Sequence, residues 1–153
     1  MKTLYSILIA MVAFVVFASV AVADPGTPWD KKIAGKGRFQ VLNQFGGDAV
    51  LDKETGRVWE QSPNGVDTRA WLNAQIHCNQ KTVGNRKGWR LPTVQELARL
   101  VEPGNPPGGP DLPPGHPFEN VQASVYWSAT TGADDTSEAW LVSFASGGVV
   151  AFD

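Results

Sequence analysis

Four cationic side chains and one tryptophan lie within ten consecutive residues, the densest group in the sequence that could bind a ligand. The cations are Lys81, Arg86, Lys87 and Arg90, and Trp89 lies among them. Ammonium and guanidinium groups bind sulfate and carboxylate groups, and an indole ring can stack on the apolar face of a sugar. Lys81, Arg86 and Lys87 are therefore the candidate ligand-binding residues, with an anionic polysaccharide as the ligand. The alternative is an ordinary solvated loop in which Trp89 points inward.

Residues that could catalyse a reaction or hold a metal are few. The chain has one cysteine, Cys78, and two histidines, His77 and His116, and their spacing does not match a zinc site. No serine stands in a glycine elbow, and the glycine patterns of phosphate and dinucleotide loops are absent. The acidic segment 134–138 could hold a calcium ion weakly, although a solvated acidic turn is the simpler interpretation. We therefore expect no catalytic residues, no metal site, no cofactor and no enzyme activity.

The N-terminal residues have the features of a secretory signal peptide. Lys2 precedes an uncharged apolar stretch at 4–22, and Ala21 and Ala23 are the small residues that a signal peptidase requires. The sequence predicts a signal peptide at residues 1–23, export through the Sec route, and a periplasmic or extracellular location. A retained membrane anchor is the alternative, because an apolar stretch of this length can just span a bilayer.

Removal of the signal peptide leaves 130 residues (153 − 23), which is enough for one domain. Of the 13 basic residues only Lys2 is lost, so 12 remain against 15 acidic residues, a net charge of −3. This balance excludes a general nucleic-acid binder, and no second apolar run is long enough to cross a membrane. All 12 remaining basic residues precede position 100, and 7 acidic residues follow it. The charges indicate either a two-signed surface or two halves that mix in the fold.

An arm and three strands are expected in the first part of the mature chain. Residues 24–37 are rich in Pro, Gly and Lys and are predicted to be a linker or arm. Alternating apolar residues predict a strand at 38–42. Further strands at 49–52 and 57–60 flank a four-residue link ending in Gly56, which suits a hairpin turn with a left-handed glycine.

The helix predicted at 68–80 is amphipathic and can be capped by Asp67 or Thr68. Its polar side is expected to hold His77, as a solvated residue and not a ligand. Cys78 lies on the apolar side and is expected to be a free, mostly buried thiol. The residues predicted for the apolar side are Trp71, Leu72, Ala74, Ile76 and Cys78.

A second helix has the strongest local signal. Thr93 and Glu96 have the spacing of a capping box, in which each side chain accepts a hydrogen bond from the other residue's backbone N–H. The following residues, 102–117, include seven prolines and four glycines and predict an irregular surface loop. Strands are predicted at 124–130, 138–144 and 149–152, in one antiparallel sheet.

Several of these segments together resemble one bacterial family, the Lcl C-terminal domain family, over Arg38 to Phe144. The family's opening pattern matches Arg38-Phe39, the Gly46–Asp48 turn and the stretch VLDKETGRVW at 50–59. Its signature W-R-L-P-T-x-x-E-L matches residues 89–97, and its later strands match residues 126–130 and 139–144.

The resemblance implies an α+β, C-type-lectin-like fold related to the formylglycine-generating enzymes, loop-rich, with two helices packed on small antiparallel sheets, over residues 38–153. The catalytic cysteine pair of those enzymes has no counterpart, because Cys78 is the single cysteine. Family members commonly continue into one more C-terminal strand, so we expect that strand to be missing after Asp153. The resemblance implies structural roles for Trp59, Trp89, Arg90, Leu91, Pro92, Thr93, Glu96, Trp127, Ser128 and Trp140.

The expected function is that of a non-enzymatic binding module on an exported bacterial protein. The best-described family member is an adhesin for sulfated polysaccharides, so the resemblance implies sulfated or other anionic polysaccharide as the ligand. The alternative is a protein-interaction or structural subunit of a cell-envelope assembly, which binds an envelope protein through the proline loop or an edge strand. If Trp89 is buried and the cations point apart, the polysaccharide hypothesis is weakened.

Overall fold

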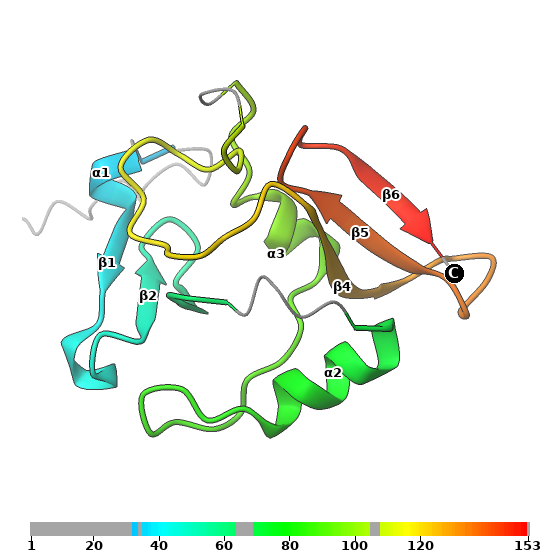
Figure 1. Ribbon diagram of the computed structural model, residues 1–153, viewed down its shortest axis with the longest axis horizontal. Coiled ribbons are helices and arrows are strands. Elements are labelled where there is room, and N and C mark those ends of the chain that lie inside the picture. Colours follow the sequence, from blue (N-terminus) through cyan, green and yellow to red (C-terminus); the bar gives the residue numbers. More distant parts are fainter. Residues whose placement is uncertain (1–31, 34, 64–68, 105–107, 153) are drawn as a thin grey trace, which may run out of the picture. The chain divides into compact units, whose positions relative to one another are not determined.

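The structure, a computed structural model, describes residues 32–33, 35–63, 69–104 and 108–152. The predicted signal peptide and most of the predicted arm lie outside these residues. In the described part, two small antiparallel sheets lie on either side of a short helix, and a longer helix contacts the second sheet (Figure 1). The α+β class is thereby confirmed. In this part of the chain, no helix is both long enough and apolar enough to cross a membrane.

The first sheet is a meander of β1 (Phe39–Val41), β2 (Ala49–Asp52) and β3 (Arg57–Glu60), in that order. The predicted strands at 49–52 and 57–60 match the structure, and a one-turn 3₁₀ helix, η1 (Asn43–Phe45), joins β1 to β2. Gly56 has φ +70° and closes the β2–β3 hairpin as predicted. The first strand begins one residue late, because Arg38 belongs to a short helix, α1 (Gly35–Arg38), formed by residues expected in the arm.

The second sheet is one antiparallel sheet, as predicted, and its strands lie in the order β4 (Val125–Thr131), β5 (Ala139–Ser143) and β6 (Val149–Phe152). The register of β4 against β5 shifts between Trp127 and Thr131, which marks a β-bulge. The bulge attaches the sheet to the segment before the second predicted helix, because Ala129 N–H donates to the carbonyl oxygen of Pro92 at 2.7 Å. β6 forms an edge of this sheet, and all its residues are exposed.

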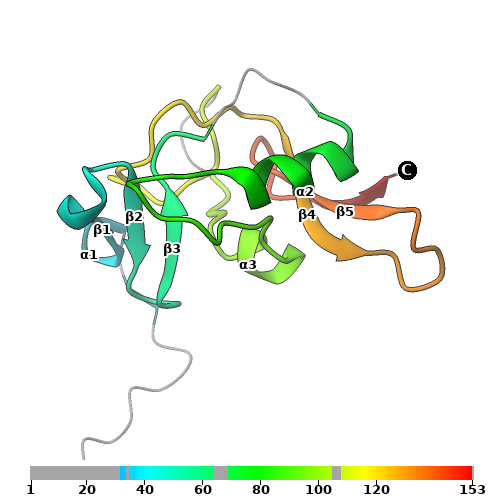
Figure 2. The same ribbon diagram turned by 90° about the horizontal axis from the view of Figure 1, so that it is seen from below.

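The short central helix, α3 (Val94–Ala98), begins with the predicted capping box. Glu96 N–H donates to Thr93 Oγ at 3.2 Å, and Thr93 N–H donates to Glu96 Oε2 at 2.9 Å. Leu97 and Leu100 are buried, and α3 packs on β4 and β5 (Figure 2). The core therefore lies where α3 meets both sheets, and its buried members are Phe39, Val50, Leu97, Leu100, Leu112, Val142 and Phe144.

The longer helix, α2 (Trp71–Gln80), does not bury the side that the sequence predicts. Leu72 and Ile76 are 62 % and 44 % exposed, whereas His77, predicted to be solvated, is half-buried. Trp71 and Cys78 are half-buried. They lie about two turns apart on a stripe narrower than the predicted apolar side, because only residues about one and two turns apart face the same side of a helix. The helix begins after Ala70, whose side chain makes no capping hydrogen bond; the proposed caps, Asp67 and Thr68, lie outside the described residues.

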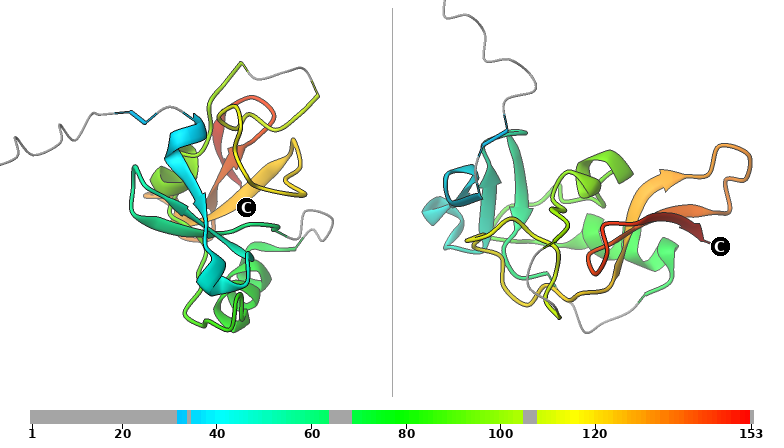
Figure 3. Two further views of the ribbon diagram at one scale, coloured as in Figure 1. Left: turned by 90° about the vertical axis from the view of Figure 1, so that its left-hand side faces the viewer. Right: turned by 90° about the horizontal axis from the view of Figure 1, so that it is seen from above.

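The proline- and glycine-rich segment 102–117 is irregular where the structure describes it, but it is not wholly a surface loop. Asp111, Leu112 and Pro113 are buried, with Leu112 only 2 % exposed. Asp111 N–H donates to the carbonyl oxygen of Phe144 at 2.7 Å. The same segment also contacts α1, because the carbonyl oxygen of Pro114 lies close to Gly35; Figure 3 shows the segment beside α1. The prediction was wrong for these residues because composition does not show which side chain of a loop reaches the core.

Candidate ligand-binding cavity

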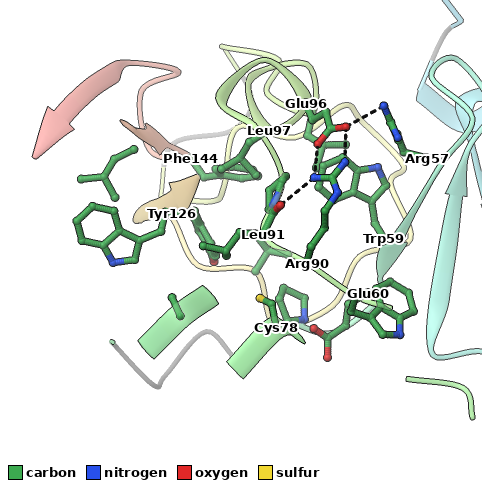
Figure 4. Close-up of a pocket in the computed structure, with 18 of the residues that line it drawn as sticks. Arg57, Trp59, Glu60, Cys78, Arg90, Leu91, Glu96, Leu97, Tyr126 and Phe144 are labelled. Carbon is green, nitrogen blue, oxygen red and sulfur yellow. Dashed lines mark hydrogen bonds and ion pairs between the residues drawn. The ribbon is translucent and has the colours of Figure 1, made fainter. Parts of the chain in front are cut away.

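A cavity of about 880 Å³ opens between β3, α2, the segment that leads into α3, and the second sheet (Figure 4). This volume falls in the range of roughly 300–1,000 Å³ found for small-molecule sites. Its wall is mainly apolar and aromatic, as most ligand sites are. Prominent wall residues are Trp59, Leu91, Leu97, Tyr126, Trp127 and Phe144.

Two indole N–H groups hold α2 against the second sheet and so fix one side of the cavity. Trp71 Nε1 donates to the carbonyl oxygen of Ser128 at 2.8 Å, and Trp127 Nε1 donates to the carbonyl oxygen of Arg69 at 2.9 Å. Ser128 is fully buried in the bulge of β4. Trp71, at the start of α2, is thus bonded to the bulge of β4, and Trp127 of β4 is bonded to the residues just before α2.

A carboxylate held by two guanidinium groups forms one polar end of the cavity (Figure 4). Glu96 Oε1 accepts from Arg90 Nη2 at 2.8 Å and forms an ion pair with Arg57, whose Nη2 lies 2.9 Å away. Glu96 Oε2 accepts from Arg90 Nη1 and from Thr93 N–H, both at 2.9 Å. The hydrogen bonds from Arg90 lower the pKa of Glu96 to about 2, with help from the Thr93 N–H and the charge of Arg57, although burial opposes this. Glu96 is thus ionised at any physiological pH.

A second ion pair and a thiol lie on the α2 side. Lys81 Nζ donates to both carboxylate oxygens of Glu60. Burial raises the pKa of Cys78 above its ordinary value, and the negative charge of Glu60 adds to this while Lys81 opposes it. Since a thiolate is the reactive form of cysteine, Cys78 is protonated and unreactive at neutral pH.

A smaller cleft of about 160 Å³ adjoins the cavity between β3 and α3. Arg57, Trp59 and Glu96 line both hollows, so the Trp59 ring stands at their boundary. The Nε1 atom of Trp59 is buried and has no hydrogen-bond partner among the described residues. The remaining lining residues of the cleft are Thr55, Gln95 and Arg99.

The three cations predicted to bind the ligand have different surroundings. Lys81 lies at the cavity but is paired with Glu60. The Arg86 guanidinium lies 5.5 Å from the ring centre of Phe45, and Lys87 is exposed. Trp89 is half-buried, and its Nε1 donates to the carbonyl oxygen of Arg86 at 2.8 Å. The structure therefore does not gather these cations around one hollow.

Most of the motif residues with predicted structural roles surround the cavity. Thr93 caps α3 and Ser128 accepts the Trp71 hydrogen bond, so both support the wall without lining it. Trp140 is half-buried in β5 and does not line the cavity. Those that line it are Trp59, Trp89, Arg90, Leu91, Pro92, Glu96 and Trp127.

Sequence reasoning missed Arg57 and Arg99 as site residues. Their positions carry a weak signal: Arg57 and Trp59 are two apart in a strand and share a face, while Gln95 and Arg99 are one helical turn apart. Nothing in the sequence shows that these two faces meet. Elsewhere in the described residues, no group of three or more His, Cys, Asp or Glu side chains could hold a metal ion.

Comparison with protein families matches the Lcl C-terminal domain to residues 48–153, which is more than half of the chain. Comparisons with curated proteins and with solved structures return no significant match. The family match includes β2, β3, α2, α3 and the whole second sheet. It therefore contains every residue that lines the cavity. The chain belongs to the Lcl C-terminal domain family.

Proposed function

We propose that the chain is a non-enzymatic binding module of an exported bacterial protein, with a C-type-lectin-like fold, and that it binds an anionic polysaccharide in the cavity. The observation that carries the proposal is the aromatic wall of an 880 Å³ cavity with guanidinium groups at its rim. Aromatic rings offer apolar faces on which sugar rings can stack. Guanidinium groups can orient the sulfate or carboxylate groups of such a polymer.

The charges at the rim move the proposed contact away from the loop predicted from the sequence. Arg57 and Arg90 share one carboxylate, Glu96, which leaves one positive charge in excess. Lys81 and Glu60 neutralise each other. Arg86 and Lys87 do not line the cavity, and they would contact only a polymer that extends beyond it.

A binding function also suits the state of the polar groups in the cavity. Glu96 accepts three hydrogen bonds, pairs with Arg57 and is ionised, Glu60 is paired with Lys81, and Cys78 is protonated. A general acid or base needs a pKa near the working pH, and a nucleophilic cysteine needs a lowered pKa. The proposal of export is supported by the sequence at residues 1–23 alone.

Retention on immobilised heparin, measured against salt concentration, tests the proposal. We expect weak retention by the wild-type protein that falls as salt rises, because exposed charge contacts are individually weak and screened. Arg57→Gln and Phe152→Ser should reduce retention, since both residues line the cavity. Lys36→Gln and Val149→Ser are matched controls, because Lys36 and Val149 are exposed and do not line it. No retention at low salt, or equal retention by all variants, would overturn the proposal.

A second candidate function rests on β6, the exposed edge of the second sheet. Ser143 N–H donates to the carbonyl oxygen of Gly148, so alternation along the ladder directs the backbone groups of Val149 and Ala151 away from β5. β6 carries no charged residue, and uncharged edges can pair with a strand of another protein. In a cell-envelope assembly, an extended envelope-protein segment would bind there. Ala151→Pro, which removes an outward N–H, should abolish binding of such peptides on an array, and unchanged binding would exclude this mode.

A further inference from the structure

Trp59, which lines the cleft between β3 and α3, has a hydrogen-bond donor that the described part of the fold leaves unused. Three other tryptophans donate their indole N–H to backbone carbonyls: Trp71 to Ser128, Trp89 to Arg86, and Trp127 to Arg69. Trp59 Nε1 is buried but has no partner among the described residues. A buried donor without an acceptor destabilises a protein, so its retention is more readily understood if a ligand supplies the acceptor.

The side chains around this donor carry an excess of positive charge. Arg99 is exposed, and its guanidinium makes no hydrogen bond or ion pair with any described residue. Glu96 does not neutralise it, because that carboxylate already pairs with Arg57 and Arg90 and accepts from Thr93 N–H. Arg57 and Arg99 both line the cleft, and its one carboxylate, Glu96, is already shared between Arg57 and Arg90.

We infer that this cleft, lined by Thr55, Arg57, Trp59, Gln95, Glu96 and Arg99, is a subsite for one oxyanion, a sulfate or carboxylate group of the ligand. Arg57 and Arg99 supply the charge, and Trp59 Nε1 donates the hydrogen bond that fixes the oxygen. The amide of Gln95 can donate to a remaining oxygen, whereas the Thr55 hydroxyl already donates to Asp52. The inference rests on the proposed function in one respect: the group belongs to a polymer whose sugar rings lie in the adjoining cavity.

The size and position of the cleft suit this role. Its volume of about 160 Å³ is below the range of drug-sized sites, so it accommodates a group and not a whole ligand. Because Arg57 and Trp59 also line the large cavity, a group in the cleft can stay bonded to a residue in the cavity. Arg57, Gln95 and Arg99 are exposed, and exposed side chains change rotamer within nanoseconds, so the cleft can open toward the indole N–H.

The indole N–H resonances of the mature chain, residues 24–153, provide a direct test. Sodium sulfate is titrated against sodium chloride at constant ionic strength, and the Trp59 signal is assigned by its loss in Trp59→Phe. We expect a saturable shift of the Trp59 resonance, whereas those of Trp71 and Trp127, already bonded to carbonyls, shift several-fold less. A parallel titration with acetate distinguishes a sulfate site from a carboxylate site.

Two charge variants complete the test. Arg99→Gln should weaken the apparent sulfate affinity at least tenfold, and Lys36→Gln, which removes one charge from α1, should leave it unchanged. The Trp71 and Trp127 resonances report whether each variant is folded. A Trp59 resonance that does not move, that moves equally in Arg99→Gln, or that moves only with every other indole would overturn the inference.

The heparin experiment separates this inference from the proposed function. Retention on heparin without a specific Trp59 shift would overturn the subsite and leave the function standing. A specific shift of the Trp59 resonance without retention on heparin would support the oxyanion site and overturn the proposal that the chain binds a polysaccharide. If neither retention on heparin nor a specific Trp59 shift is observed, both the proposed function and the subsite are overturned.

Discussion

Arg38 and Asp52 form a buried ion pair that ties the end of α1 to the end of β2. Arg38 Nε and Nη2 donate to the two carboxylate oxygens of Asp52 at 2.9 and 2.7 Å, and the side chains are only 3 % and 1 % exposed. Arg38 Nη2 also donates to the carbonyl oxygen of Arg99, directly after α3. Asp52 in turn accepts from Glu54 N–H and Thr55 Oγ in the hairpin turn. One ion pair thus joins the first sheet, its turn and the end of the central helix.

Loss of either partner should therefore destabilise the domain strongly. Arg38→Met and Asp52→Asn should each lower the free energy of unfolding by about 3–5 kcal/mol, because the remaining group stays buried without its partner. Urea denaturation provides the measurement. The double variant should lose clearly less than the sum of the two, and additive losses would show that the pair does not act as a unit.

The capping box of α3 should show that Glu96 has a larger role than Thr93. Thr93→Ala removes one cap and should cost about 1 kcal/mol. Glu96→Ala removes the reciprocal cap and also leaves Arg57 and Arg90 without their shared carboxylate, so its cost should be larger, on the order of 2 kcal/mol. In a thermal-melt cycle the double variant should lose less than the sum, because the two caps depend on each other. Equal losses for the two single variants would contradict this assignment.

The low pKa of Glu96 makes part of the stability depend on pH. In the folded protein that pKa is about 2, against an ordinary value of 4.5. A lowered carboxyl pKa contributes stability that is fully present above about 4.5 and is lost as the pH falls toward 2. Partial solvent exposure of Arg57 and Arg90 limits the contribution to about 1–3 kcal/mol. Unfolding measured from pH 6 to pH 2 should show a shallower loss of stability in Glu96→Gln than in the wild type, and parallel curves would disprove the linkage.

Gly84 and Gly88 provide a matched pair of substitutions in one loop. Both have a positive φ, +53° and +90°, so alanine is strained at either position. A Cβ atom at Gly84 would overlap the backbone and Cβ of Phe45, whereas one at Gly88 would meet nothing within 4 Å. Gly84→Ala should therefore lower the free energy of unfolding by about 1–3 kcal/mol more than Gly88→Ala. Similar melting temperatures for the two variants would show that the loop can move away from Phe45.

The thiol of Cys78 should react slowly. Its side chain is half-buried, and burial raises its pKa above the ordinary value of 9.0. Alkylation by iodoacetamide at pH 7.5 should be much slower than that of a solvent-exposed cysteine introduced at Leu72, on the exposed side of the same helix. The rate should still be rising above pH 9, because only the thiolate reacts. A rate that levels off near neutral pH would identify an activated cysteine instead.

The features that could be predicted from the sequence are those decided within a few residues. The turn before Gly56 and the capping box at Thr93 depend on side chains at most four positions apart, and both are confirmed. The strand positions follow from alternation of apolar residues, a local property as well. The family match adds that these local features occur in the order that the family requires.

The remaining features depend on partners distant in the sequence. Glu60, 21 residues before Lys81, neutralises that lysine, and the charge pattern of the 81–90 loop gives no indication of this. Leu72 and Ile76 are exposed because α2 contacts β4 along a narrow stripe, whereas the helical wheel assumes that every apolar residue faces the core. Arg57 and Arg99 come together only through the packing of β3 beside α3.

The division of the 102–117 segment into anchored and exposed parts determines where this protein can be enlarged. Leu112 is fixed in the core, and an insertion beside it would disturb the packing of both sheets. Gly108 is exposed, and space is open around it. Because surface loops tolerate added residues at little thermodynamic cost, an epitope or a whole domain can be inserted at Gly108 without altering the cavity.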